Sequence, residues 1–396
     1  MQNNLIIVGN FIDSKIKLSR KLPAINPAAS NRMIALSNAM IYNKNRVIIV
    51  SSSTAASIQF DRKIFIRGAV IKRGNTLIVC SPTIAIPILS SILELFFLPY
   101  TYIKVLWKIK KVSYVILYNY FPSLIIIALI SKILRIKVIE DLQDISSLSF
   151  KYLANLKLME KLQQFVGYFS MKIIISLAYK VLIPTIRFSK FLPLNKKVEI
   201  ISGCINVNKS IIHKQEQQII NILYSGLINS EQGFYLFLDS LKIIDNESIY
   251  RLNRLVVHIS GYGMGKKELL TLTKDIHNVK VIVHGFLPNE EYNDLLKKID
   301  VCLALQDPTG KNSNLKTPSK TYEYFSFGKA VIVSDVGDFR KMPLDSRILL
   351  EPYTPANLAS ILLSISKSDI ENYKVNALKY VAENWSYEIV AKKITG

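Results

Sequence analysis

Short runs of isoleucine, valine and leucine recur along the chain, and longer segments with helical spacing of apolar residues separate them. Continuous apolar runs are typical of strands buried on both faces of a sheet, whereas apolar residues three and four positions apart indicate helices. The alternation of the two patterns predicts an α/β fold with parallel sheets. In the first half the predicted strands are Leu5–Val8, Val47–Val50, Thr76–Cys80, Tyr114–Leu117, Val138–Ile139, Val181–Pro184 and Val198–Ile205, and the predicted helices are Met33–Tyr42, Ile84–Phe97, Ser123–Leu134 and a stretch around 152–170.

The second half continues the alternation after a polar segment, Asn206–Gln218, which is a predicted interdomain linker. Its predicted strands are Ile219–Ser225, Leu255–Ser260, Val279–Val283, Val301–Leu305 and Ala330–Ser334, and its predicted helices are Glu290–Ile299 and Thr317–Phe327. A chain of 396 residues is long enough for two domains of this kind.

Two uncharged runs of twenty residues, Gly74–Leu93 and Val112–Ser131, have the length of a membrane-spanning helix. Prolines at 82, 87 and 122 interrupt them, so strand–turn–helix units are favoured over membrane spans. The start of the chain has the pattern of a first strand and not that of a signal peptide.

Cysteine and histidine content argues against several site classes. The three cysteines are widely spaced, which disfavours a disulfide framework or a zinc ribbon and favours a reducing compartment. The sequence contains no His-x-x-x-His or Asp-x-Asp pattern, so we expect no metal site and no bound cofactor.

The net charge of +22 is concentrated in the first half. Residues 1–205 contain 28 lysines and arginines against 8 acidic residues, while residues 206–396 contain 23 against 21. An excess confined to one half indicates a polyanionic partner for that half, with nucleic acid and an anionic membrane surface as the candidates. Aromatic residues and lysines alternate within Ile84–Trp107 and just after it, which suits contact with lipid headgroups; a helix buried between domains is the alternative.

The most informative segment is Thr317–Gly337, which predicts a helix leading directly into a buried strand. Thr317 can cap the helix, Pro318 suits its first position, and Gly328 suits the residue after its end. Ser319, Lys320 and Glu323 have the spacing of one helical face near the amino terminus. Free N–H groups and partial positive charge at that terminus favour a phosphate.

Glu323 can accept two hydrogen bonds from a vicinal diol such as a ribose, so the segment fits a nucleotide diphosphate.

This segment resembles the signature of the family-4 group of retaining, nucleotide-sugar-dependent glycosyltransferases. The similarity is to the branch written Pro-Ser-Lys…Glu-Tyr…Gly-Lys-Pro-Val-Ile, which is common among enzymes of bacterial surface polysaccharides; Ala330-Val331-Ile332 replaces Pro-Val-Ile here. The resemblance implies the GT-B fold, with two Rossmann-like domains whose parallel sheets face across a cleft. It implies an acceptor domain at 1–205, a donor domain at 206–384, and a helix at about 385–396 that packs back onto the first domain.

Glycines end three predicted strands of the donor domain, at Gly226, Gly261 and Gly285. The resemblance places the donor at these ends, with the turn of Gly285, Phe286 and Leu287 supplying backbone bonds to the base. Relatives usually have an arginine and a lysine in the turn Gly226–Gly233, where this chain has Leu227 and Gln232.

Loss of that cationic clamp leaves three interpretations: Lys320 and Arg32 carry the phosphate charge, the donor binds with a different geometry, or the chain is impaired. The first is favoured because the flanking glycines still permit close approach of the backbone.

In the first half, Ser30 or Asn31 can cap the helix that follows, which places Arg32 in the first turn. A cation there opposes the helix dipole, and a bound phosphate would compensate; a surface arginine without a role is the alternative. Glu140 and Asp141 follow the strand Val138–Ile139, at the strand end where relatives carry a His-Asp pair. One of them, or Asp144, is expected to orient the acceptor, take its proton, or stabilise charge on the sugar; a helix cap is the alternative for Asp144.

The sequence thus predicts a metal-independent, retaining glycosyltransferase of the hexosyltransferase type. Its expected partners are a nucleotide sugar, a glycan or polyisoprenyl-diphosphate-linked acceptor and an anionic membrane surface, with no nucleic acid. The expected location is cytoplasmic, at the inner face of the cytoplasmic membrane, in surface polysaccharide synthesis. The competing functions are a non-hydrolysing sugar-nucleotide epimerase, disfavoured because the first half lacks histidine, and a binding protein that has lost activity.

Overall fold

The computed structural model describes residues 4–12, 16, 28–52, 64–109, 111–145, 158–206, 219–247, 254–264, 266–310, 313–315 and 318–396. The chain forms two compact units. The first comprises Met1–Pro184, Phe188–Cys204 and Tyr387–Gly396, and the second comprises Thr185–Arg187 and Ile205–Ser386. The predicted linker, apart from Asn206, lies outside the described residues.

The first unit is built on an eight-stranded sheet with the order β10-β9-β8-β7-β1-β2-β5-β4. Its strands are β1 (Asn4–Gly9), β2 (Arg46–Ser51), β4 (Ala69–Arg73), β5 (Thr76–Cys80), β7 (Val112–Tyr118), β8 (Lys137–Asp141), β9 (Lys180–Ile183) and β10 (Val198–Ile200). All neighbours pair in parallel except β4 and β5, which form an antiparallel pair at the edge. A small antiparallel pair joins β3 (Phe65–Ile66) to β6 (Thr83–Ile84).

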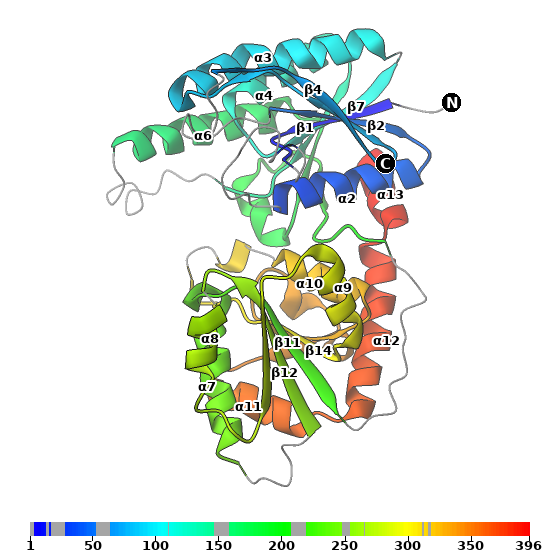
Figure 1. Ribbon diagram of the computed structural model, residues 1–396. Helices are drawn as coiled ribbons and strands as arrows, with labels where there is room; N and C mark the ends of the chain where they lie inside the picture. Colours follow the sequence, from blue (N-terminus) through cyan, green and yellow to red (C-terminus); the bar gives the residue numbers. More distant parts are fainter. Residues whose placement is uncertain are drawn as a thin grey trace. The chain divides into compact units, whose positions relative to one another are not determined.

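Helices cover both faces of this sheet (Figure 1). They are α2 (Ala28–Tyr42), α3 (Pro87–Lys108), α4 (Pro122–Ile133), α6 (Leu158–Leu177) and α13 (Tyr387–Thr395), with the 3₁₀ segment η2 (Ile186–Phe191) after β9. Leu36 of α2 and Val390 of α13 share one core with Leu5 and Ile7 of β1, so α2 and α13 cover one face. The helices α3, α4 and α6 pack on the opposite face, with α4 in contact with both of the others.

The second unit has a six-stranded parallel sheet with the order β13-β12-β11-β14-β15-β16. Its strands are β11 (Ile220–Leu227), β12 (Leu255–Tyr262), β13 (Lys280–Gly285), β14 (Val301–Ala304), β15 (Ala330–Ser334) and β16 (Ile348–Leu350). Its helices are α7 (Phe234–Asp245), α8 (Lys266–Leu272), α9 (Asn289–Lys298), α10 (Ser319–Ser326), α11 (Pro355–Ser364) and α12 (Lys367–Asn384), and short 3₁₀ segments are η3 (Ser230–Gln232), η5 (Ser313–Leu315), η6 (Phe339–Lys341) and η7 (Leu344–Ser346). The predicted α/β class with parallel sheets is confirmed in both units.

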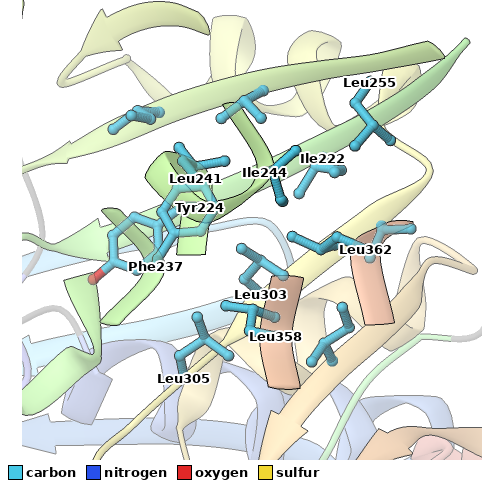
Figure 2. Packing of buried hydrophobic residues seen from close by; sticks show 14 of the residues in the cluster. Ile222, Tyr224, Phe237, Leu241, Ile244, Leu255, Leu303, Leu305, Leu358 and Leu362 are labelled. Carbon is cyan, nitrogen blue, oxygen red and sulfur yellow. The ribbon is translucent and has the colours of Figure 1, made fainter. Parts of the chain in front are cut away.

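Apolar packing on both faces of the second sheet explains its continuous apolar strands. Tyr224 of β11 stacks on Phe237 of α7 with ring centroids 5.4 Å apart, and Leu358 and Leu362 of α11 join the same cluster (Figure 2). Trp385 packs in the cluster on the other face, at the end of α12. With both faces covered, polar ligands can meet this unit at the carboxyl edge of the strands.

Two helix boundaries differ from the prediction. The first is α3, expected over Ile84–Phe97, which continues through Pro99 to Lys108. A proline removes one backbone hydrogen bond, but the burial of Leu98 just before it and of Tyr102 and Val105 beyond it holds the helix together. The second is α2, which begins at Ala28, so Arg32 lies in its second turn and not in its first.

One helix among the described residues is long and apolar enough to cross a membrane by length and composition. It is the stretch Leu89–Lys108 of α3, with a mean hydropathy of 1.3 and 33% of its window buried. A single helix of this kind is weak evidence for a span, because core helices of soluble proteins pass the same test.

Candidate functional site

Three glycines line up at the carboxyl edge of the second unit's sheet. Gly226 of β11 is the register partner of Gly261 of β12, and Gly285 of β13 is the partner of Ser260, which precedes Gly261. A Cβ atom on Gly261 would lie 2.0 Å from the Gly226 carbonyl oxygen. The close pairing of these strands therefore requires glycine, and it leaves backbone without side chains along the edge.

Lys320 lies at this glycine edge. It belongs to the first turn of α10, whose N-cap residue Pro318 provides no side-chain hydrogen bond. Its Nζ donates to the Ser225 Oγ at 2.6 Å and is 5.1 Å from the centre of the Tyr292 ring. A Cβ built on Gly226 would be 3.9 Å from the same Nζ, so the ammonium is next to the glycine backbone.

Burial shapes the charge of this pair of side chains. Burial lowers the pKa of Lys320, and the neighbouring Glu323 carboxylate partly offsets this effect by raising the same pKa. Burial raises the pKa of Glu323, and the Lys320 charge partly offsets this effect by lowering that pKa. No hydrogen bond to the Glu323 carboxyl comes from the described residues, so its oxygens remain free to accept from a ligand.

The turn after β11 lacks a cation, as the sequence indicated. Asn229 caps η3 by accepting from the Gln232 N–H at 2.9 Å, and Leu227 is partly exposed. Gly233 has a φ of +73°, and a Cβ there would lie 2.0 Å from the Leu305 carbonyl oxygen. The backbone of this turn thus requires glycine at position 233, and the side chains of Leu227 and Gln232 carry no charge.

The remaining predicted donor residues lie around this edge. Gly285 has a φ of +74°, Phe286 after it is 73% exposed, and Leu287 is half-buried. Ser319 begins α10, and Thr317 lies outside the described residues. The structure thus brings Gly226, Gly261 and Lys320 together in the second unit.

The Lys320 ammonium is positioned by Ser225 and Tyr292, neither of which was predicted from the sequence as a site residue. Ser225 directly precedes a strand-end glycine, which is a signal that could have been used. Tyr292 occupies an apolar position of an ordinary amphipathic helix and carries no such signal.

The candidate residues of the first unit form a separate group. Arg32 of α2 binds Asp141 of β8 through two hydrogen bonds, from Nε to Oδ2 at 3.1 Å and from Nη2 to Oδ1 at 3.0 Å. Gln143 adds a third, from Nε2 to Asp141 Oδ1 at 2.7 Å. Asp141 thus supplies a counter-charge for Arg32, and the expected contact of Arg32 with a phosphate stays a prediction. Asn31 beside it is exposed.

Glu140 points to the other face of the sheet, since consecutive strand residues alternate. It is 0% exposed, and no described residue hydrogen-bonds to either carboxyl oxygen. Burial, reinforced by the Asp141 charge, raises the pKa of Glu140 well above its usual value. The catalytic role expected of Glu140 stays a prediction, and it would require a substrate to reach a carboxyl that is fully buried in this structure.

Asp144 is linked through Asn119 to Gln143, which binds Asp141. Its Oδ2 accepts from Asn119 Nδ2 at 2.9 Å, and Asn119 Oδ1 accepts from the Gln143 and Asp144 amides. These bonds order the segment that follows Asp141.

Comparisons with known proteins relate the second unit to a protein family. Residues 220–368 match the family model of group 1 glycosyl transferases, and the match begins at β11 and includes the glycine edge and α10. No curated protein matches the chain.

Solved structures match the whole chain at low identity. A structure from E. coli described as trehalose-6-phosphate bound with UDP-2-fluoro glucose has a TM-score of 0.62 and 10% identity, with 99% of this chain and 98% of that chain covered. A sucrose-phosphate synthase from Thermosynechococcus elongatus has a TM-score of 0.60 at 12% identity, with 99% and 97% covered. Anabaena Alr3699/HepE in complex with UDP has a TM-score of 0.59 at 13% identity, with 99% and 98% covered. The chain has the GT-B fold of these proteins, and its residues 220–368 match the group 1 glycosyl transferases.

Proposed function

We propose that this protein transfers a glycosyl group from a nucleotide-diphosphate sugar to an acceptor. The observation that carries the proposal is the Lys320 ammonium, held by Ser225 beside the glycine edge of the second unit. A half-buried ammonium next to glycine backbone is suited to an anionic group such as a diphosphate.

The donor is proposed to bind with its diphosphate at Lys320 and the start of α10. Glu323, one turn further along the same helix, would accept hydrogen bonds from the ribose hydroxyls, and the Gly285–Leu287 turn would contact the base. Uridine nucleotides are the first probes to use, because neighbours of the same fold are complexes with UDP and UDP-2-fluoro glucose.

Chemistry at this site would be electrostatic. As the bond between the sugar and the diphosphate breaks, negative charge grows on the leaving phosphate, and a preorganised ammonium stabilises it. Retention at the anomeric carbon, independence of metal ions and transfer of a hexosyl group are proposed on the resemblance of the Thr317–Gly337 segment to retaining enzymes. In the first unit, Asp141 is proposed to position Arg32 for contact with a substrate.

The acceptor is proposed to be a glycan or a polyisoprenyl-diphosphate-linked glycan in surface polysaccharide synthesis. Support comes from the excess of 28 basic over 8 acidic residues in positions 1–205, which suits an anionic or membrane-bound acceptor. The protein would then work in the cytoplasm, peripherally at the inner face of the cytoplasmic membrane.

The test is a thermal-shift screen of the full chain against nucleotides and nucleotide sugars, followed by transfer assays with any ligand found. We expect at least one nucleotide sugar to raise the melting temperature through binding to the folded state. NMR of the product would report the anomeric configuration. A screen in which no nucleotide stabilises the protein would remove the proposal.

A further inference from the structure

Two long helices of the first unit expose apolar side chains on the side turned away from the sheet. In α3, Ile92, Phe96 and Trp107 have helical spacing, and Phe96 and Trp107 are 65% and 84% exposed. In α6, Leu162, Phe165 and Phe169 form a second stripe with the same spacing. We call the surface formed by these six residues the outer helix face.

Each of these helices also has a buried stripe on its opposite side. Leu98, Tyr102 and Val105 of α3 are buried, and the Tyr102 hydroxyl is 2.7 Å from Ser131 Oγ of α4. Met171 and Ile174 of α6 are buried likewise. A large apolar patch exposed to water is unfavourable and marks a surface that contacts something else. A helix with an apolar stripe on each of two opposite sides is therefore suited to a second apolar environment in addition to the protein core.

Lysines accompany the outer helix face. The helices α3, α4 and α6 carry five lysines, Lys104, Lys108, Lys132, Lys161 and Lys172, against two glutamates. One of the glutamates, Glu94, turns inward and accepts from Ser123 Oγ at 3.1 Å. Lys104 lies with its Nζ 4.4 Å from the centre of the exposed Tyr100 ring. Long basic side chains beside exposed aromatic rings match the headgroup region of an anionic bilayer.

We infer that the outer helix face docks onto an anionic lipid bilayer, with α3 and α6 lying in the headgroup layer. The buried stripe of α3 fixes this helix to α4, so it can lie on a membrane while the first unit stays folded. The inference deepens the proposed function, on which its purpose rests: it names the surface that would bring the first unit to a lipid-linked acceptor.

Trp107 permits a direct test, since the chain has only two tryptophans and the other, Trp385, is 5% exposed in the second unit. The full chain is mixed with vesicles of phosphatidylglycerol and phosphatidylcholine, or phosphatidylcholine alone, carrying brominated acyl chains. We expect quenching of Trp107 emission on the anionic vesicles at low salt, release at high salt, and no quenching in the Trp107→Phe variant.

A variant set locates the surface. The double substitution Phe96→Ser with Phe165→Ser is expected to weaken vesicle binding at least about tenfold, because it removes two aromatic rings that would insert into the bilayer. Lys104→Glu with Lys108→Glu is expected to abolish the preference for anionic lipid. Leu344→Ser, at a residue 78% exposed in the second unit, is the matched control and should bind as the wild type does.

Two outcomes would overturn the inference. One is vesicle binding that the Phe96 and Phe165 substitutions leave unchanged. The other is a lipid-free dimer that these substitutions convert to a monomer, which would assign the face to a second copy of the chain. Nucleotide binding is measured without vesicles on the same variants and separates the two proposals. Loss of vesicle binding with intact nucleotide binding bears only on the outer helix face. Intact vesicle binding without nucleotide binding bears only on the proposed function.

Discussion

Asp141 on β8 and Arg32 on α2 form a two-pronged ion pair across 109 positions of sequence, and the two side chains are 0% and 11% exposed. Removal of one partner from a buried ion pair leaves the other charge buried without a counter-charge, which destabilises the fold. Replacement of both partners by apolar side chains often costs little stability. We expect Asp141→Asn to destabilise the first unit by about 3 kcal/mol and Arg32→Met with Asp141→Leu to restore much of that loss.

Native-state hydrogen exchange of the β7 and β8 amides measures this effect within the first unit alone. The control is Glu388→Gln, which breaks the exposed Lys392–Glu388 pair and should cost less than about 1 kcal/mol. Equal losses in the Asp141 and Glu388 variants would show that the buried pair has no special contribution.

Lys320→Met should weaken UDP binding roughly 10- to 100-fold, because a hydrogen bond to a charged group is lost. The protein should stay folded, since burial already disfavours the Lys320 charge and lowers its pKa. Calorimetric titration gives the affinity. Lys329→Met is the control: this buried lysine donates to the Lys297 and Ile299 carbonyls at 3.1 and 2.8 Å, so its loss should lower stability and spare UDP affinity.

Glu323→Ala tests the proposed contact with the ribose. We expect it to weaken UDP binding by about tenfold, and to leave binding of 2′,3′-dideoxy-UDP unchanged because that ligand lacks both hydroxyls. The comparison of the two ligands in the two proteins is made by titration. An equal loss for both ligands would place Glu323 away from the ribose, and no loss for either would favour the binding-protein alternative.

His258 should make the second unit sensitive to acid. Burial, aided by the His284, Lys280 and Lys298 charges, lowers the pKa of His258 from 6.5 to about 4. Between these values the unfolded chain binds more protons than the folded chain, so stability is present above pH 6.5 and falls as the pH drops toward 4. The loss should approach about 3 kcal/mol.

Urea unfolding at several pH values measures the slope for wild type and His258→Gln. The variant should lose the steep decline, while His277→Gln, at an exposed histidine, should keep it. An unchanged slope in His258→Gln would assign the acid sensitivity to other groups.

Much of the fold was predictable because both sheets are parallel and buried, which produces continuous apolar strands. β11 was expected at Ile219–Ser225 and is found at Ile220–Leu227. The edge strand β4 was missed, because most of its side chains are exposed and its apolar run, residues 69–71, is short. The predicted length of α3 was wrong because the packing of residues after Pro99 outweighs the local preference of proline to end a helix.

The glycine edge could be located from sequence because each glycine follows an apolar run after one polar residue. The surroundings of Lys320 could not, since Ser225 is 95 positions away and only the fold brings it within 2.6 Å. Arg32 and Asp141 were both singled out, but their pairing depends on how α2 packs on the sheet that contains β8 and has no local signature. The burial of Glu140 could not be predicted from its neighbour Asp141, because adjacent strand positions face opposite sides of the sheet.

The placement of α13 has a consequence for biosynthesis. This helix packs against α2 in the first unit, and its Lys393 and Ile394 carbonyls accept from the buried Lys180 Nζ at 2.7 and 3.2 Å. Nearly the whole second unit, Ile205–Ser386, is translated between β10 and α13. On the ribosome, the first unit can therefore complete its core only after the chain of the second unit has been made.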